Sequence, residues 1–197
     1  MSQNVKLENQ NVWMEGNYSS KLIHLKNAVV IEGLSKLTET KVEFVSSDDS
    51  LDLQDLLAST ITLGQLDVRD KERYFTGICV SVEYKGLQKG LSHFVADLRP
   101  WLWYLTRTNE NRIFQEKTVL EIIQDVLNGP NYGFWSAIEK RTTATYKKRP
   151  YSVQYNETDF DFISRLMEEE GIYYYFIQDG KQLKMVLADS ISAHKPT

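Results

Sequence analysis

Apolar and polar residues alternate along several short stretches in the first half of the chain. In residues 78–85 every second side chain is apolar, which is typical of a strand that covers a core with one face. Alternation also occurs at 42–45, 61–64 and 94–98, the short apolar runs at 22–25 and 28–31 are further predicted strands, and a turn is expected at 85–90. Five or six short, closely spaced strands predict a small β-barrel or sandwich.

The second half of the chain changes to the helical period. Residues 118–121 form a Thr-x-x-Glu capping box, whose threonine accepts a hydrogen bond from a free amide at the start of a helix. Apolar residues then recur at helical spacing until an Asn-Gly-Pro stop at 128–130. A second helix is predicted from Thr158 to Gly171, with a buried stripe of Phe162, Ile163, Leu166 and Met167. Two strands follow at 172–176 and 183–187, joined by a hairpin turn at 178–181.

These patterns predict a mainly β fold with an α+β second part. Residues 1–20 are rich in Asn, Gln and Ser and lack periodicity, so we expect a tail or loosely docked arm. Residues 21–108 are predicted to form a β-barrel domain that includes one short helix at 52–57, capped by Asp52. Residues 109–197 are predicted to form an α+β lobe with two helices and a β-hairpin, the start of a truncated second part.

The composition changes the range of possible functions. Of the 197 residues, 42% are hydrophobic and 25% charged, as in folded proteins, and the formal net charge of −4 argues against non-specific nucleic-acid binding. The single cysteine, Cys79, lies on the polar side of its predicted strand and cannot form an intramolecular disulfide. The longest apolar run, 172–177, is far shorter than the roughly 18 residues that span a bilayer, and no secretory signal is visible. We therefore expect a soluble protein made in the cytoplasm.

Few residues suggest chemistry. Phosphate-loop and nucleophile-elbow motifs are absent from the sequence, and the three histidines lack metal-ligand spacing. Asp159 and Asp161 could form a carboxylate pair, but residues two apart point to different sides of a helix, and acids in a first turn have a structural reason. The sequence predicts no catalytic, cofactor-binding or metal site.

Two unusual clusters suggest an interface. In an alternating strand, Trp101 and Trp103 would share one face and Tyr104 would lie on the other, so both faces would be covered by a core or by another subunit. Glutamates at 168–170 crowd the last turn of the second helix, where the helix dipole disfavours negative charge, and Arg165 can pair with Glu169. A solvated acidic face, and a solvated loop for the basic run at 147–149, are the plainer explanations. The candidate interface residues are Trp101, Trp103, Tyr104, Glu168, Glu169, Glu170, Tyr173 and Tyr175.

Several stretches, taken in order, carry a family resemblance. They are RYFTGI at 73–78, LRPWLWYLT at 98–106, RIFQEKTV at 112–119, YSVQYNETDFDFISRLMEEEGIYYYF at 151–176 and LADS at 187–190. Over residues 21–194 the chain resembles the front half of the valine–glycine repeat protein G (VgrG) family. That front half is similar to the hub of contractile phage tails, also called the late control gene D protein. The acidic helix end is part of this signature.

The resemblance implies a structural part of the bacterial type VI secretion spike. Three copies would form a ring that docks on the hexameric tube of hemolysin-coregulated protein and meets baseplate proteins. Family members continue into further barrels and a β-helical needle, which carries a PAAR-repeat tip and effectors. This chain stops at Thr197, so we expect a truncated piece or a short relative. Such a protein is cytoplasmic before firing and is exported without a signal peptide. Its role is mechanical, with no cofactor, nucleic acid or membrane insertion.

Two rival functions stay open at this point. The first is a carbohydrate-binding module in which sugars stack on exposed rings of Trp101, Trp103 or Tyr173–Tyr175. The second is a hydrolase that uses Glu169 or Asp161.

Overall fold

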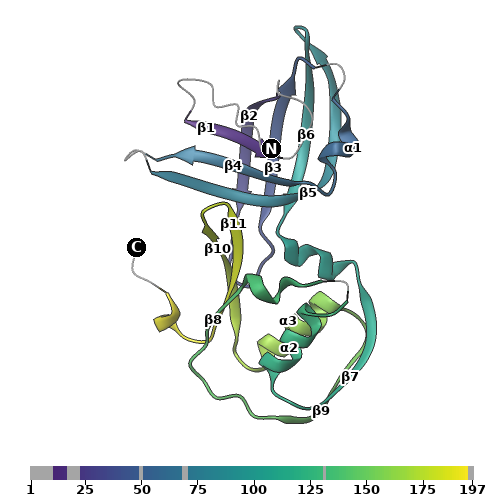
Figure 1. The fold of residues 1–197 in the computed structure, drawn as a ribbon, viewed down its shortest axis with the longest axis vertical. Helices are drawn as coiled ribbons and strands as arrows, with labels where there is room; N and C mark the ends of the chain where they lie inside the picture. The colour runs from purple at the N-terminus through teal and green to yellow at the C-terminus, as the bar shows by residue number, and fades with distance from the viewer. Residues whose placement is uncertain (1–10, 17–22, 49–50, 68–70, 131, 195–197) are drawn as a thin grey trace. The chain divides into compact units, whose positions relative to one another are not determined.

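The computed structural model describes residues 11–16, 23–48, 51–67, 71–130 and 132–194 (Figure 1). The chain divides into two compact units. The first comprises residues up to Glu32, Leu37–Pro100 and the tip of a hairpin, Gln178–Leu183; the second comprises Gly33–Lys36, Trp101–Ile177 and Lys184 onward. The division after Pro100 lies earlier than the predicted domain boundary at 108, because the rings that follow Pro100 pack within the second unit.

The first unit is built on one antiparallel sheet of six strands in the order β1-β4-β5-β6-β3-β2. The sheet curls into an open half-barrel (Figure 1), which confirms the prediction of a small barrel-like β domain. A short helix, α1 (Leu53–Leu56), begins at Asp52, whose side chain accepts a hydrogen bond from the amide of Gln54 as predicted. The strands are β1 (Val12–Gly16), β2 (Ile23–Ile31), β3 (Glu39–Ser46), β4 (Thr60–Leu66), β5 (Glu72–Gln88) and β6 (Leu91–Arg99).

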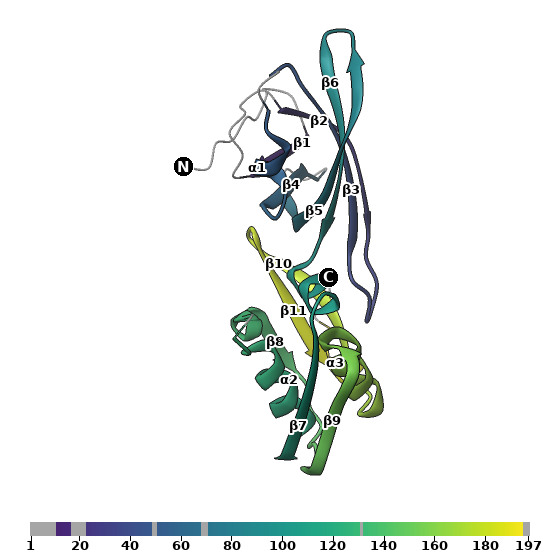
Figure 2. The same ribbon diagram turned by 90° about the vertical axis from the view of Figure 1, so that its right-hand side faces the viewer.

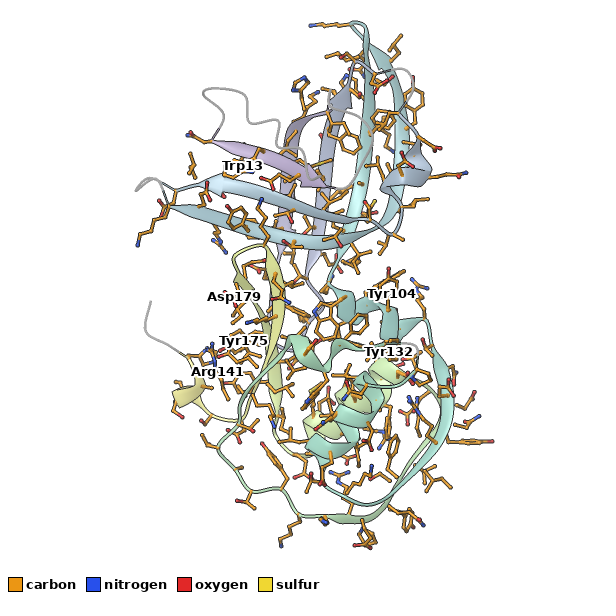
Figure 3. All side chains as sticks on the ribbon, in the orientation of Figure 1. Trp13, Tyr104, Tyr132, Arg141, Tyr175 and Asp179 are labelled. Atoms are coloured by element: carbon orange, nitrogen blue, oxygen red, sulfur yellow. The ribbon has the colours of Figure 1, made fainter. Side chains whose placement is uncertain are left out.

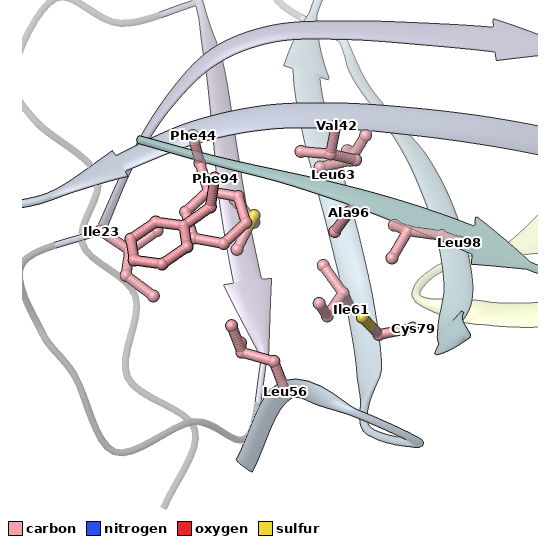
Figure 4. Packing of buried hydrophobic residues seen from close by; sticks show 11 residues of the cluster. Ile23, Val42, Phe44, Leu56, Ile61, Leu63, Cys79, Phe94, Ala96 and Leu98 are labelled. Carbon is pink, nitrogen blue, oxygen red and sulfur yellow. The ribbon is translucent and has the colours of Figure 1, made fainter. Parts of the chain in front are cut away.

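The core of this sheet follows from the alternation of its strands. Val42 and Phe44 of β3 and Phe94, Ala96 and Leu98 of β6 point inward and are almost fully buried (Figure 4). The rings of Phe44 and Phe94 stack with centroids 5.1 Å apart. Each large apolar side chain buried in this way stabilises the fold by about 1.5–3 kcal/mol relative to an exposed one, so the inner face of the sheet supplies the main stabilisation of the unit.

Three features of the first unit differ from the sequence predictions. Within the predicted arm, Val12–Gly16 is strand β1, paired with β4 and with Trp13 buried; residues 1–10 and 17–20 lie outside the described residues. The runs at 22–25 and 28–31 belong to one strand, because a bulge between Leu25 and Asn27 absorbs the break in alternation. The turn expected at 85–90 is only Lys89–Gly90, both with positive φ, the geometry of a tight hairpin turn.

A bulge also inverts the predicted faces of β5. The pairing register shifts between Cys79 and Ser81, and one extra residue exchanges the inner and outer sides of a strand. Cys79 is therefore 1% exposed and belongs to the core, so its assignment to the polar face was wrong. After the bulge Val82 packs against the same core, as predicted.

The described part of the second unit combines two α-helices and three short 3-10 helices with two small sheets, as the ribbon in Figure 2 shows. One sheet has the order β10-β11-β8, in which β11 and β8 run parallel, and the other is an antiparallel ribbon of β7 and β9. The strands are β7 (Asn109–Lys117), β8 (Ile138–Arg141), β9 (Arg149–Thr158), β10 (Tyr173–Asp179) and β11 (Gln182–Ala188). The helices are η1 (Trp101–Thr106), α2 (Val119–Leu127), η2 (Phe134–Ala137), α3 (Asp159–Glu169) and η3 (Ile191–Ala193).

The two main helices are confirmed together with their caps. The amide of Glu121 donates to Thr118 Oγ1 at 3.3 Å, while the amide of Thr118 donates to Glu121 Oε2 at 2.7 Å, which completes the predicted capping box of α2. Thr158 caps α3, and Gly171 ends it with φ +68°. The predicted apolar stripes of both helices are buried. Strands β7, β8 and β9 were not predicted as strands.

Candidate functional site

The tryptophan cluster is a 3-10 helix rather than a strand. Pro100 fixes its own φ and lacks an amide hydrogen, so the ladder of β6 ends there. In the helix that follows, residues three apart share a face; Leu102 and Leu105 are fully buried, and Trp101 is 9% exposed. The strand with two apolar faces was therefore a wrong prediction. These residues instead form a helix, η1, that lies against α3 and buries one side in the core.

The rings of this cluster pack mainly on one another. Trp101 and Tyr104, three residues apart, both contact Phe134, with ring centroids 4.8 and 6.3 Å away, and Tyr132 stacks on the same ring at 5.6 Å. Tyr104 and Tyr132 are labelled in Figure 3. The guanidinium carbon of Arg107 lies 4.4 Å from the centroid of the Trp103 ring. Because each of these rings already packs against a neighbour within the chain, the arrangement favours a structural role over a platform for sugars.

The acidic end of α3 has a partner that the sequence reasoning missed. Arg149, at the start of β9, donates from Nη1 to Glu169 and from Nη2 to Glu170, each at 2.6 Å. The predicted pair of Arg165 with Glu169 is present at 3.3 Å. These two guanidinium groups, Arg149 first, hold the pKa of Glu169 below its usual range, so the acids are compensated. Glu168 is exposed. The signal was the basic run at 147–149, which was assigned to a solvated loop.

Asp159 is the centre of a buried polar network. Its carboxylate is 1% exposed, pairs with Arg112 of β7, and accepts hydrogen bonds from Gln154 Nε2 at 2.7 Å and the Tyr132 hydroxyl at 3.0 Å. Burial and the carboxylate raise the pKa of Tyr132 to about 12. The carboxylate of Asp161, by contrast, accepts from the hydroxyl of Thr158 at 2.7 Å. Both acids are thus engaged in holding the start of α3, which leaves little to support a hydrolase that uses Asp161.

Tyr173 and Tyr175 lie on one face of β10 and contact the residues after β11. The ring of His194 stacks on both tyrosines, with centroids 5.7 and 5.0 Å away. Arg141 donates from Nη1 to the Tyr175 hydroxyl at 2.9 Å and to the carbonyl of Ala193 at 3.0 Å (Figure 3). These two candidate interface residues therefore hold the η3 segment against the rest of the second unit.

A second carboxylate fixes the loop between β8 and β9. Asp189 accepts hydrogen bonds from the amides of Thr143 and Ala144 and from the Tyr146 hydroxyl, all at 2.7–2.9 Å. The amide donors stabilise the charged form and hold the pKa of Asp189 at about 2. Asp189 is the third residue of the LADS motif, so this part of the family signature has a structural role.

The described ranges contain little that could support catalysis. They hold no group of three or more His, Cys, Asp or Glu side chains suited to a metal ion. Burial raises the pKa of the Cys79 thiol to about 11, which keeps it protonated and unreactive. No helix within these ranges has the length and apolar character needed to cross a bilayer.

One exposed apolar surface was missed by the sequence reasoning. Ile113 of β7 and Tyr151, Val153 and Tyr155 of β9 are 69%, 68%, 41% and 77% exposed. Ile113 is paired directly with Val153, and alternate residues of a strand share a face. We call these four residues the ribbon face. The alternation in 151–155 could have revealed it, but it was read only as a family motif.

Comparison with known proteins decides the family. A family model described as "Phage tail baseplate hub (GPD)" matches residues 31–197. The chain belongs to this phage tail hub family. The resemblance expected from the sequence, to the hub-like part of VgrG proteins, is confirmed. The chain is 41% identical over 164 residues to the type VI secretion system spike protein VgrG1a of Pseudomonas aeruginosa. The matched stretch covers 83% of this chain and 25% of that relative.

Other relatives agree. The spike protein VgrG1c of the same organism is 37% identical over 183 residues, covering 93% of the chain and 25% of that protein. The fold is similar to that of the Escherichia coli c3393 protein, described as a type VI secretion component similar to T4 bacteriophage tail proteins gp27 and gp5, with a TM-score of 0.76, 22% identity and coverage of 88% of this chain and 50% of that one. This confirms the predicted mainly β, phage tail hub-like fold. The chain spans about a quarter of the length of these two spike proteins.

Proposed function

We propose that this chain is a structural building block of the hub of a type VI secretion spike. In this role three copies form a ring that docks on the tube of hemolysin-coregulated protein and contacts baseplate proteins. The ring transmits thrust to a needle that carries a PAAR tip and effectors, and the protein leaves the cell through the apparatus itself. A solved structure with a similar fold, a Francisella PdpA–VgrG complex, supports the idea of protein partners.

The observation that carries this proposal is that the unusual carboxylates and aromatic rings of the second unit are engaged in contacts within the chain. The carboxylates of Asp159, Asp189 and Glu169 each bind donors from other elements of the second unit, and the rings of Trp101 and Tyr175 pack against neighbours. These contacts tie the elements of the second unit together and stiffen it, as a part that transmits force requires. The match to spike proteins over most of the chain gives the mechanical role its context.

Co-sedimentation tests the proposal. The purified chain is mixed with assembled tubes of hemolysin-coregulated protein and centrifuged, and an unrelated acidic protein of similar size serves as the control. We expect the chain to pellet with the tubes, saturating at the number of tube ends rather than at the number of tube subunits. A chain that stays in the supernatant at every tube concentration would refute docking, and binding along the whole tube would refute a hub at its end.

A further inference from the structure

The curled sheet of the first unit has an open side. Its two edge strands, β1 and β2, approach each other, and a groove of about 390 Å³ lies between β2 and the strands β1, β4 and β5. Apolar side chains of Leu25, Val30, Leu63 and Phe75 line it, together with the polar residues Asn27 and Gln65. A long edge strand rich in β-branched residues is a surface at which another chain can dock, and the apolar groove beside β2 offers room for side chains of a partner.

The ribbon face of the second unit has matching chemistry. Two of its four residues are tyrosines, which combine a large apolar ring with a polar tip and are enriched among the anchor residues of interfaces. A groove with apolar walls and amide groups from Asn27 and Gln65 offers both parts of a tyrosine a suitable surface. Tyr151 and Tyr155 are more than two-thirds exposed, so most of each side chain is accessible to a partner.

The charges at the ends of the two surfaces are complementary. Exposed Lys147 and Lys148 precede the first residue of β9, and Glu157 stands near its end. In β2 the order is reversed, since Lys26 lies in the first half and Glu32 follows the last residue. If β9 of one copy crosses β2 of another in the antiparallel sense, the lysines face Glu32, which also pairs with Arg73 of its own chain, and Glu157, which also pairs with Arg165, faces Lys26. The parallel sense would bring like charges together.

We infer that the ribbon face of one copy packs into the β2 groove of a second copy, with Tyr151 and Tyr155 as its anchors. The two surfaces are different, so the contact is head-to-tail and leaves one ribbon face and one groove free at the ends of every open assembly. Such contacts can close into a ring. This inference rests on the proposed ring, and it names the surfaces that join its copies.

Two variants test the inference by removing one surface each. Tyr151→Ser/Tyr155→Ser removes the anchors, and Ala28→Arg places a charged side chain on an exposed residue of the groove. Matched controls are Ile191→Ser, an apolar residue that is 89% exposed, and Val29→Arg, which is 49% exposed and next to Ala28. Circular dichroism and thermal unfolding check that all variants fold.

Sedimentation velocity then gives the association state. We expect the wild-type chain and both controls to self-associate, and each single-surface variant to lose at least about 30-fold in affinity, as the loss of a hot-spot tyrosine predicts. An equimolar mixture of the two variants should form one-to-one pairs and nothing larger, because only one intact ribbon face and one intact groove can meet.

Three results would overturn the inference: a wild-type chain that is monomeric up to about 0.5 mM, where even weak association shows; variants that associate like the wild type; or a mixture that stays monomeric. Its failure is distinguishable from that of the proposed function. A chain that pellets with tubes but shows no effect of either variant loses only this contact, whereas one that pairs as expected but ignores tubes loses the docking role.

Discussion

Removal of the Asp159 carboxylate should be among the most damaging single changes in the second unit. The carboxylate is 1% exposed, pairs with Arg112 and accepts from Gln154 and Tyr132. Asp159→Ala leaves these donors without their acceptor. The loss of one partner from a buried ion pair costs about 3–5 kcal/mol. Because Arg112 keeps 25% of its side-chain exposure and can be hydrated, we expect the lower end, about 3 kcal/mol.

Urea unfolding monitored by tryptophan fluorescence and circular dichroism gives the free energy of unfolding. A loss of about 3 kcal/mol should lower the midpoint by about 1 M or more. Asp161→Ala is the matched control, since it removes the same charge from the same helical turn at an exposed site. That control should cost only about 1 kcal/mol for the helix dipole and the bond to Thr158.

A double-mutant cycle isolates the pair itself. Arg112→Met alone strands a buried carboxylate, so it should be as harmful as Asp159→Ala. The double variant should be less destabilised than the sum of the two by at least about 1.5 kcal/mol. Strictly additive effects, or a cost of Asp159→Ala no larger than that of Asp161→Ala, would show that the network does not hold the ribbon to α3.

Three further predictions follow from single sites. The pKa of Asp189 in the folded chain is about 2, below its ordinary value of 3.8, so its contribution to stability is present above about pH 4 and is lost as the pH falls toward 2. Asp189→Asn should lower stability at pH 7 and flatten this acid limb in urea titrations, and an unchanged limb would contradict the role of the amide donors. Gly64→Ala should destabilise the first unit severely, because a Cβ there would overlap the Trp13 ring, whereas Gly33→Ala meets only the flexible Lys36 side chain; equal melting temperatures for the two variants would refute this. The buried Cys79 thiol, with its pKa raised to about 11, should react with iodoacetamide at pH 8 only in denaturant, and prompt labelling of the folded chain would show that the core opens at that point.

The sequence alone determined those features of the protein that depend on neighbouring residues. The capping box at Thr118 and Glu121, the apolar stripes of the two helices and the stop at Gly171 are all decided within one or two turns of backbone, so periodicity and cap chemistry identify them. The mainly β character of the first unit followed in the same way from alternation. The family motifs added the hub-like fold, because their order and spacing along the chain preserve it.

Only the tertiary structure decided the features that depend on contacts between distant segments of the chain. The register shift after Cys79 reversed the faces of β5, since one extra residue in a strand depends on how its neighbours pair. Asp159 received its ligands from Arg112 and Tyr132, and Glu169 received Arg149, across 20 to 47 positions of sequence. The ribbon face became visible only when β7 paired with β9. Hydrogen bonds and burial act through space, so a local pattern shows that a side chain is unusual, whereas the fold shows what it contacts.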